Sequence, residues 1–257
     1  MATEKKEFQT WNGKKIVFYP NSHRYKLGDQ YLLSPSAIVG VVDKSRPLMI
    51  WNDNLIKEDV YSQTKEIFTL DEHRQDVLRL IDLRNVKVKE AQNIGTAIHK
   101  YVEDVAYSKT AGTDTPPLPE GIDEKAVEAF NSLEFANNIE FDDVEQFVYS
   151  EKYGVPYCGL LDARIILNGK KTLCDWKTSK NIYFTHKVQL AGYDLALEEQ
   201  HNGVAPYEQI AIIHLDKNTG VGTIHILTPE ERADSRKAFL HALELKTLVK
   251  KYDTFKE

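Results

Sequence analysis

The chain has 257 residues, of which 42% are hydrophobic and 28% charged, and its formal net charge is −6 at pH 7. This length suits one large domain or a core with an elaboration, and the composition is that of an ordinary globular protein. No apolar run approaches the ~18 residues that a transmembrane helix needs, so no membrane partner is expected. The two cysteines, Cys158 and Cys174, indicate a reducing compartment and exclude a disulfide scaffold or a four-cysteine zinc or iron–sulfur site within the chain.

The charges are distributed unevenly along the chain. Residues 113–146 contain ten acidic residues and one lysine, whereas residues 168–187 contain five lysines and one aspartate. A local basic surface can attract a polyanion even when the total charge is negative. Lysines on exposed strands also serve solubility alone, so the cluster by itself does not identify a partner.

The N-terminal part begins with strand-like segments and continues with helical ones. Residues 15–19 and 23–33 have the composition of short strands, with a turn at Gly28-Asp29. The sequence Ser34-Pro35-Ser36 is typical of a helix start. Residues 48–107 are mostly helical in pattern.

The middle of the chain predicts a loop, a helix and then strands. Residues 110–121 are rich in Pro, Gly and Thr and predict a loop, and a helix is expected over 123–137. Strands are expected at 144–151, at about 159–167 and at about 171–178.

The C-terminal part predicts a helix over 186–199, two strands and a final helix. The strands are expected at 209–215 and 222–227. The final helix opens with T-P-E-E at 228–231, in which threonine is the N-cap, proline the first helical residue and the second glutamate completes a capping box. The whole order of elements predicts an α/β or α+β fold.

The dipeptide Asn168-Gly169 predicts a β-hairpin, because a type I′ turn needs positive φ at both of its central positions. Counting outward from a two-residue turn places Asp162 opposite Asp175. Period-two alternation puts Lys177 on the same face as Asp175. The opposite face is apolar and is expected to lie against the core: it consists of Leu161, Ala163, Ile165, Leu167, Cys174 and Trp176.

Two directly opposed carboxylates destabilise a strand pair. At ~4 Å and an effective dielectric constant of ~20, their repulsion is about 4 kcal/mol. Three arrangements would offset it: one carboxyl could be protonated, Arg164 or Lys177 could pair with the acids, or an oxygen-bound divalent cation could lie between them. The plain alternative is an exposed hairpin whose aspartates separate into water.

Lys177 favours the metal interpretation. A cation two residues beyond Asp175 can orient an attacking water or offset the charge that develops on a phosphate. Two carboxylates, a metal ion and a lysine together are suited to hydrolysing a phosphodiester bond.

Several motifs occur in an order that resembles the PD-(D/E)XK nuclease superfamily, most of all its RecB-like and mitochondrial-genome-maintenance-exonuclease-like branch. The segments Gly159–Asp162, D-W-K-T-S-K at Asp175–Lys180 and Q-L-A-G-Y at Gln189–Tyr193 resemble its catalytic motifs. Upstream, G-T-A-I-H-K-Y-V-E-D at Gly95–Asp104 resembles the helix motif G-T-x-x-H-x-x-x-E, and His23–Val39 resembles the hairpin and helix start of the same branch.

The resemblance implies a restriction-endonuclease-like core, with a mixed central β-sheet flanked by helices. Residues 91–257 would form this nuclease core. Residues 1–90 would form an N-terminal hairpin and helical elaboration packed on it.

The resemblance also implies roles for the motif residues. Asp162 and Asp175 would bind Mg²⁺ or Mn²⁺, helped by the backbone carbonyl of Trp176 and by His99, directly or through water. Lys177 would position the attacking water or stabilise the transition state. The cysteines that hold an iron–sulfur cluster in some relatives are absent, so no such cluster is expected.

Further residues would support the site. Gln189 and Tyr193, one helical turn apart, would line it and contact the DNA backbone. Glu103 shares the helix face of His99 and would orient it. Additional candidates for nucleic-acid contact are Thr96, Arg164 and Lys180, and Glu151 is a candidate further acid.

The expected function is that of a metal-dependent DNA exonuclease acting at DNA ends or on single-stranded DNA in recombination, repair or replication. The alternatives are a structure-specific endonuclease on the same core and a nucleic-acid-binding protein that has lost catalysis. DNA is the expected partner, together with a recombination or replication protein. The first residues lack the apolar stretch of a signal peptide, which predicts a cytoplasmic protein, bacterial or phage-encoded.

Overall fold

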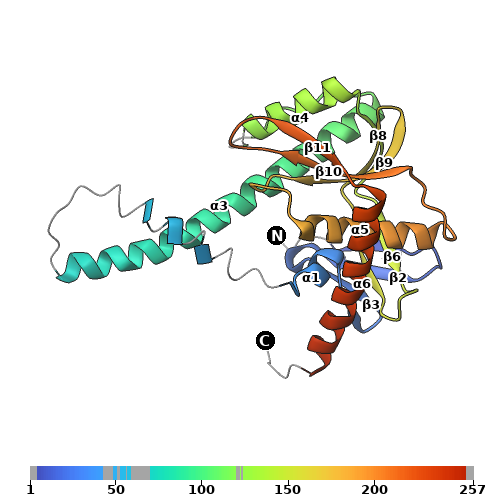
Figure 1. Ribbon diagram of the computed structural model, residues 1–257, viewed down its shortest axis with the longest axis horizontal. Coiled ribbons are helices and arrows are strands. Elements are labelled where there is room, and N and C mark those ends of the chain that lie inside the picture. The colour runs from blue at the N-terminus through green and yellow to red at the C-terminus, as the bar shows by residue number, and fades with distance from the viewer. Residues whose placement is uncertain are drawn as a thin grey trace. The chain divides into compact units, whose positions relative to one another are not determined.

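The computed structural model describes residues 5–42, 49–50, 53–55, 57–58, 70–119, 122 and 124–252. The chain forms two compact units, one of Met1–Val42 with Ile98–Glu257 and one of Asp43–Ala97 (Figure 1). This division differs from the expected one at residue 90, because the N-terminal strands belong to the larger unit. The helical pattern expected at 48–69 lies mostly outside the described residues.

An antiparallel four-stranded sheet forms the N-terminal part of the larger unit. Its strands are β1 (Lys6–Gln9), β2 (Lys15–Tyr19), β3 (Arg24–Leu27) and β4 (Gln30–Leu32), in that spatial order. One face of the sheet buries a cluster that includes Phe18, Tyr25 and Cys158. This cluster joins the sheet to the second half of the chain, which is the physical reason that the two parts form one unit.

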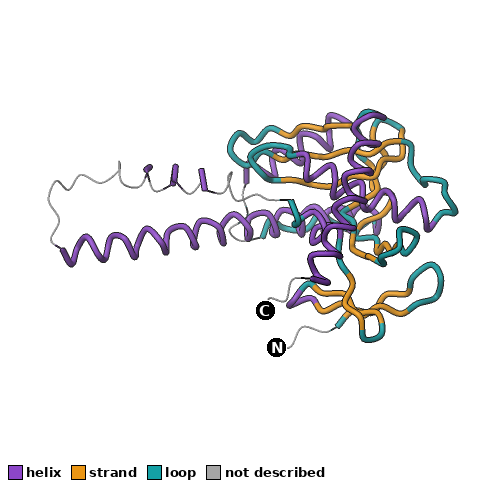
Figure 2. The backbone as a smooth tube through the Cα atoms, turned by 60° about the horizontal axis from the view of Figure 1, so that its bottom comes forward, coloured by secondary structure: helices purple, strands orange, loops and turns teal. Residues whose placement is uncertain are grey.

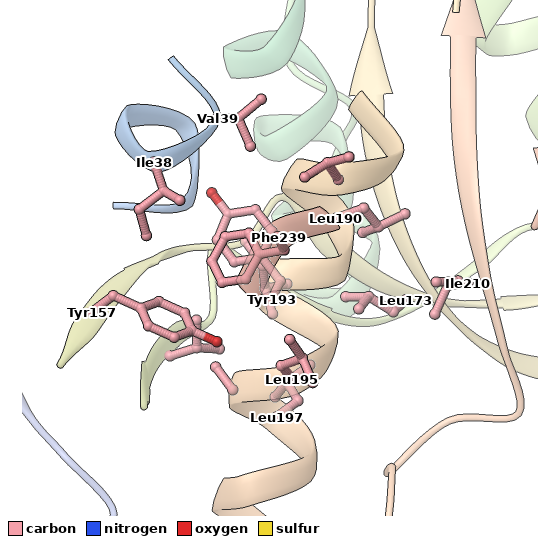
Figure 3. Close-up of a cluster of buried hydrophobic side chains, with 14 of the residues drawn as sticks. Ile38, Val39, Tyr157, Leu173, Leu190, Tyr193, Leu195, Leu197, Ile210 and Phe239 are labelled. Atoms are coloured by element: carbon pink, nitrogen blue, oxygen red, sulfur yellow. The ribbon is translucent and has the colours of Figure 1, made fainter. Parts of the chain in front are cut away.

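A short helix follows the sheet and enters the core. Helix α1 (Pro35–Val39) begins at Ser34, whose hydroxyl accepts a 3.2 Å hydrogen bond from the Ala37 amide. Ile38 and Val39 are buried in a large apolar cluster (Figure 3). The helix start expected at Ser34-Pro35-Ser36 is therefore confirmed.

The central sheet has five strands in the order β11-β10-β9-β8-β5. Strands β9 and β10 are parallel and the other neighbours are antiparallel, so the sheet is mixed. The strands are β5 (Glu140–Val144), β8 (Ala163–Leu167), β9 (Lys170–Lys177), β10 (Gln209–Leu215) and β11 (Gly222–Ile226).

The single strand expected at 159–167 is wrong, because the chain changes sheets within it. Strand β7 (Tyr157–Leu160) pairs with β6 (Phe147–Ser150) in a separate two-stranded sheet, and β8 then begins at Ala163. Leu161 and Asp162 lie between the two strands. Their backbone is held by the β5–β6 connection: the Leu161 amide donates to the Gln146 carbonyl at 3.0 Å, and the Glu145 amide donates to the Asp162 carbonyl at 3.0 Å.

The longer helices are α3 (Leu70–Ala111), α4 (Glu124–Asn137), α5 (Phe184–Gln200) and α6 (Pro229–Tyr252). Helix α4 packs on β10 and β11, and α5 packs on β9, β10 and β6 as well as on α6 (Figures 1 and 2). A mixed central sheet flanked by helices is the expected α+β class, which is confirmed.

Alternation along β9 sends its side chains to opposite sides of the sheet. The Trp176 ring lies edge-on to Phe130 of α4, with 5.7 Å between ring centroids. Leu173 instead belongs to the apolar cluster that contains Leu190 and Tyr193 of α5 (Figure 3). Asp175 and Lys177 share the parity of Leu173, so the strand directs them to the α5 side.

Candidate active site

The hairpin turn has the expected geometry. Asn168 has φ of 51° and Gly169 has φ of 78°, as a type I′ turn requires. The register pairs Leu167 with Lys170 and continues to Ala163 opposite Cys174. The next position outward on each side is Asp162 and Asp175, so the predicted register is confirmed up to the residues that neighbour the two acids.

Asp175 is the most deeply buried acid of the site. It is 1% exposed; its Oδ2 is paired with Lys177, and its Oδ1 has no hydrogen-bond partner among the described residues. Burial raises its pKa to about 6, with Lys177 opposing the rise, Asp162 adding to it and His99 opposing it more weakly. A buried carboxylate with one unsatisfied oxygen is costly, so the fold retains a group that is suited to binding a cation.

Lys177 supplies a neighbouring cation. Its Nζ lies 2.6 Å from Oδ2 of Asp175, so the two side chains form a buried ion pair. Burial lowers the pKa of Lys177, but the nearby carboxylates of Asp175 and Asp162 raise it, and the net direction is upward. Lys177 therefore carries its charge at neutral pH beside the buried acid.

Asp162 and His99 complete the group from two other elements. The carboxylate of Asp162 accepts a 2.9 Å hydrogen bond from the Trp176 backbone amide, across the hairpin. His99, on α3, places Nδ1 3.5 Å from Oδ2 of Asp162. His99 is thus close to the hairpin acid Asp162, although the two residues are distant in sequence, and its role as a metal ligand remains a prediction.

Helix α5 contributes two further side chains. Tyr193 is 6% exposed, and the pKa of its hydroxyl is raised well above the usual value by burial and then by Asp162 and Asp175. The Gln189 side chain hydrogen-bonds the tyrosine and opposes that rise. Three elements, α3, β9 and α5, together with the connection between β7 and β8, thus bring together His99, Asp162, Asp175, Lys177, Gln189 and Tyr193.

Glu103 lies near this group but has other partners. Its carboxylate is 3.4 Å from Nζ of Lys100. Burial and the neighbouring Glu145 raise the pKa of Glu103. Its expected role of orienting His99 remains a prediction.

Two other expected site residues make structural contacts elsewhere. Glu151 binds Lys14 and accepts a 2.8 Å hydrogen bond from Asn12, so it belongs to a cluster with the N-terminal sheet. Nη2 of Arg164 lies 3.3 Å from Oδ2 of Asp143 and 3.5 Å from Oδ2 of Asp142, and both aspartates are on the edge strand β5. A phosphate contact by Arg164 therefore remains a prediction, made by a side chain already engaged with acids.

The remaining candidates for nucleic-acid contact are exposed. Lys180 follows β9 by three residues, and Thr96 lies in the part of α3 that belongs to the smaller unit. Their contacts with a nucleic acid, and a metal contact by the Trp176 carbonyl, remain predictions.

The donor set fits Mg²⁺ or Mn²⁺ by its chemistry. Mg²⁺ is usually bound by one or two carboxylates, with water and substrate phosphates completing its coordination. The carboxylate of Asp175, whose Oδ1 has no partner among the described residues, and the carboxylate of Asp162 match that mode. Among the described residues, no group of three or more His, Cys, Asp or Glu side chains is arranged so that it could hold a metal ion by itself.

Sequence reasoning missed two residues that hold the site in place. Glu145 has φ of 51°, unusual for a residue other than glycine, and its amide binds the Asp162 carbonyl. His214 of β10 pairs in register with Lys177, and its Nε2 contacts the Ser179 carbonyl. No local signal marks either residue, because both act through strands distant in sequence.

Comparisons with known proteins add two weak likenesses. No protein-family model matches the chain, and no curated protein matches it in sequence. A protein named "Putative exonuclease" from Eubacterium rectale has a TM-score of 0.37 and 14% identity, covering 64% of this chain and 76% of its own. The protein SSO0001 has a TM-score of 0.32 and 14% identity, covering 80% of this chain and 87% of its own. At these TM-scores the likenesses do not assign the chain to a family.

Within the described residues, none of the helices combines the length and the apolar character that crossing a membrane requires.

Proposed function

We propose that the chain is a metal-dependent nuclease that hydrolyses phosphodiester bonds of DNA, as an exonuclease at ends or on single-stranded segments. One observation carries the proposal. Asp175 is 1% exposed and its Oδ1 has no hydrogen-bond partner among the described residues, while Asp162 and Lys177 lie beside it. A site that binds a cation and then a phosphate accounts for this costly arrangement.

Asp162 and Asp175 would hold Mg²⁺ or Mn²⁺, with His99 and the Trp176 carbonyl as candidate further ligands. Bound there, the ion would supply a more acidic water and neutralise charge on the phosphate. The Trp176 amide already fixes one oxygen of Asp162. The carboxylate of Asp162 is therefore preorganised by the hairpin backbone.

Lys177 would act on the reacting phosphate. Its ammonium is held by Asp175 in a mostly buried position and stays charged at neutral pH. There it can donate hydrogen bonds to the attacking water or to a phosphate oxygen, where charge develops in the transition state. Gln189 and the Tyr193 hydroxyl can donate hydrogen bonds to the neighbouring phosphate oxygens and orient the strand.

The test is incubation of the protein with end-labelled single- and double-stranded DNA in Mg²⁺, Mn²⁺ or chelator. Cleavage in the presence of metal is expected, with none in chelator. Asp175→Ala is expected to abolish cleavage while the protein remains folded. Full cleavage by purified Asp175→Ala would overturn the proposal.

Two controls separate the rival functions. A covalently closed circle of single-stranded DNA has no end, so an exonuclease leaves it intact and an endonuclease opens it. An inactive binding protein would bind Mn²⁺ in calorimetry and bind DNA, yet cleave no nucleic acid.

A further inference from the structure

The face of α5 that carries Gln189 and Tyr193 continues outward to solvent. His186, Gln189 and Tyr193 are spaced i, i+3 and i+7, so they lie on one side of the helix. Tyr193 is buried beside the acids, whereas Tyr183, directly before the first helical residue, is 47% exposed. The rise from residue 183 to residue 193 is about 15 Å.

Tyr183 is attached to this face by His186. Its backbone amide donates a 3.3 Å hydrogen bond to Nδ1 of His186, and the His186 amide donates a 3.0 Å hydrogen bond to the Tyr183 carbonyl. The two rings meet edge to face, with centroids 5.3 Å apart and planes at 81°. An exposed ring held in this way loses little further freedom when it binds a ligand.

The loop between Lys177 and Tyr183 is also held in place. The Ser179 carbonyl contacts Nε2 of His214, on the strand beside Lys177. The Ser179 hydroxyl donates a 2.8 Å hydrogen bond to the Asn181 carbonyl. The position of Tyr183 relative to Lys177 is therefore set by the fold, and exposed Lys180 lies on the same loop.

We propose that Tyr183, supported by His186, stacks on an unpaired nucleobase of the strand whose phosphodiester lies at Asp162 and Asp175. This inference rests on the proposed nuclease function and specifies its substrate as single-stranded. An exposed aromatic ring on the same loop as an exposed lysine is a combination that binds single strands, because every base has a π-face and every phosphate a negative charge. A base within a duplex is already stacked on its neighbours and cannot offer its face.

Phe184 provides a matched control. It is 55% exposed and adjacent to Tyr183 in sequence. As the first residue of α5 it precedes His186 by two positions, which turns it by about 200° to the opposite side of the helix. An unspecific apolar contact would involve Phe184 as much as Tyr183, whereas the stacking contact involves Tyr183 alone.

The test measures binding of labelled single-stranded oligo(dT) by fluorescence anisotropy in chelator, where no metal-dependent cleavage occurs. Tyr183→Ala is expected to weaken binding about 5- to 100-fold. Tyr183→Phe and Phe184→Ala are expected to stay within about twofold of wild type. Tyr183→Leu keeps an apolar side chain against His186, so it guards against misfolding, and it is expected to lose binding as Tyr183→Ala does.

A strand of the same length made entirely of abasic nucleotides tests the role of the base. Wild type and Tyr183→Ala are expected to bind it equally. The inference is overturned if Tyr183→Ala and Tyr183→Leu bind oligo(dT) like wild type, or if Phe184→Ala loses as much affinity for oligo(dT) as Tyr183→Ala does. It is also overturned if Tyr183→Ala weakens binding of the abasic strand as strongly as it weakens binding of oligo(dT).

The two proposals fail separately. Metal-dependent cleavage without any effect of Tyr183 on binding overturns the stacking contact alone. Binding that depends on Tyr183, without cleavage in any metal, overturns the nuclease function alone.

Discussion

The backbone amide of Trp176 donates a 2.9 Å hydrogen bond to the carboxylate of Asp162. In the chain this amide lies between Asp175 and Lys177, so the bond anchors Asp162 against the strand segment that carries both. The imidazole of His99 approaches the same carboxylate oxygen. Asp162 is thus oriented by the hairpin and by α3 before any ligand arrives, and such preorganisation is what an electrostatic catalytic site needs.

Replacing Lys177 tests its catalytic role. Lys177→Met keeps an apolar side chain of similar length in a mostly buried position but removes the charge beside Asp175. Loss of one charged donor to the transition state is expected to lower the rate of DNA cleavage at least ~100-fold. Initial rates on labelled DNA measure it, with the exposed Lys171 on the same strand mutated to Met as the control. A Lys177→Met enzyme within tenfold of wild type would contradict this role.

Metal affinity is expected to depend on pH through Asp175. Burial raises the pKa of its carboxyl to about 6, and a metal binds only the deprotonated form. Below about pH 6, Mn²⁺ must displace the proton bound to Asp175. The apparent affinity for Mn²⁺ therefore falls by up to ~10-fold for each unit by which the pH is lowered, whereas above pH 6 it changes little.

Calorimetric titration with Mn²⁺ between pH 5 and pH 8 measures this dependence. Asp175→Asn, which cannot ionise, is expected to bind Mn²⁺ weakly at every pH. An affinity for the wild-type protein that is unchanged from pH 5 to pH 7 would show that another group holds the ion.

The N-terminus of α6 is expected to respond to acid through Glu231. Lys187 and the Thr228 amide lower the pKa of Glu231 to about 2, and His225 contributes further. Because the folded-state pKa lies below the unfolded one, this carboxylate stabilises the fold above about pH 4.5, and the contribution is lost as the pH falls toward 2.

Glu231→Gln is expected to lower the free energy of unfolding at pH 7 by about 1 kcal/mol, because it weakens a capping box and an ion pair that is partly exposed. It is also expected to flatten the loss of stability between pH 4.5 and pH 2. Urea unfolding at several pH values measures both effects. Glu230→Gln, one residue away and exposed, is the control and should retain the wild-type slope.

The glycine of the Q-L-A-G-Y segment is expected to serve packing. A Cβ at Gly192 would lie 2.4 Å from the ring of Phe239 on α6, and the Gly192 carbonyl accepts a 2.9 Å hydrogen bond from Tyr157. Gly192→Ala is therefore expected to destabilise the protein by about 1–3 kcal/mol.

A double mutant tests that cause. If the clash with Phe239 is responsible, Gly192→Ala combined with Phe239→Leu should cost less than the sum of the two single changes. Thermal or urea unfolding of the wild type, the two single mutants and the double mutant gives the coupling free energy between the two positions. If the two losses of stability simply add, the effect of Gly192→Ala has a cause other than the α5–α6 contact.

Local sequence signals were sufficient for the hairpin and for the helix starts. The turn at Asn168-Gly169 depends on the φ preferences of two residues, and period-two alternation then carries the register outward. The capping box of α6 is equally local: Glu231 and Thr228 exchange hydrogen bonds of 3.0 and 3.1 Å. Such features involve residues within a few positions of each other, so their energies can be judged without the rest of the chain.

The break at Leu161 and Asp162 could not be predicted in the same way. The residues there are compatible with a continuous strand, and it is the partners Glu145 and Gln146 that divert the chain from one sheet to the other. The assignment of the N-terminal sheet to the larger unit has a similar cause, since Cys158 completes the cluster that its aromatic face buries.

For this protein, the sequence alone determined the register of the hairpin that carries Asp175 and ends next to Asp162, because a tight turn and strand alternation are short-range constraints. The tertiary structure alone decided how those acids behave. Asp175 is removed from water only when β9 is enclosed by neighbouring strands and by α5, and this desolvation raises its pKa. Desolvation depends on every surrounding element at once, so no short segment of the sequence encodes it.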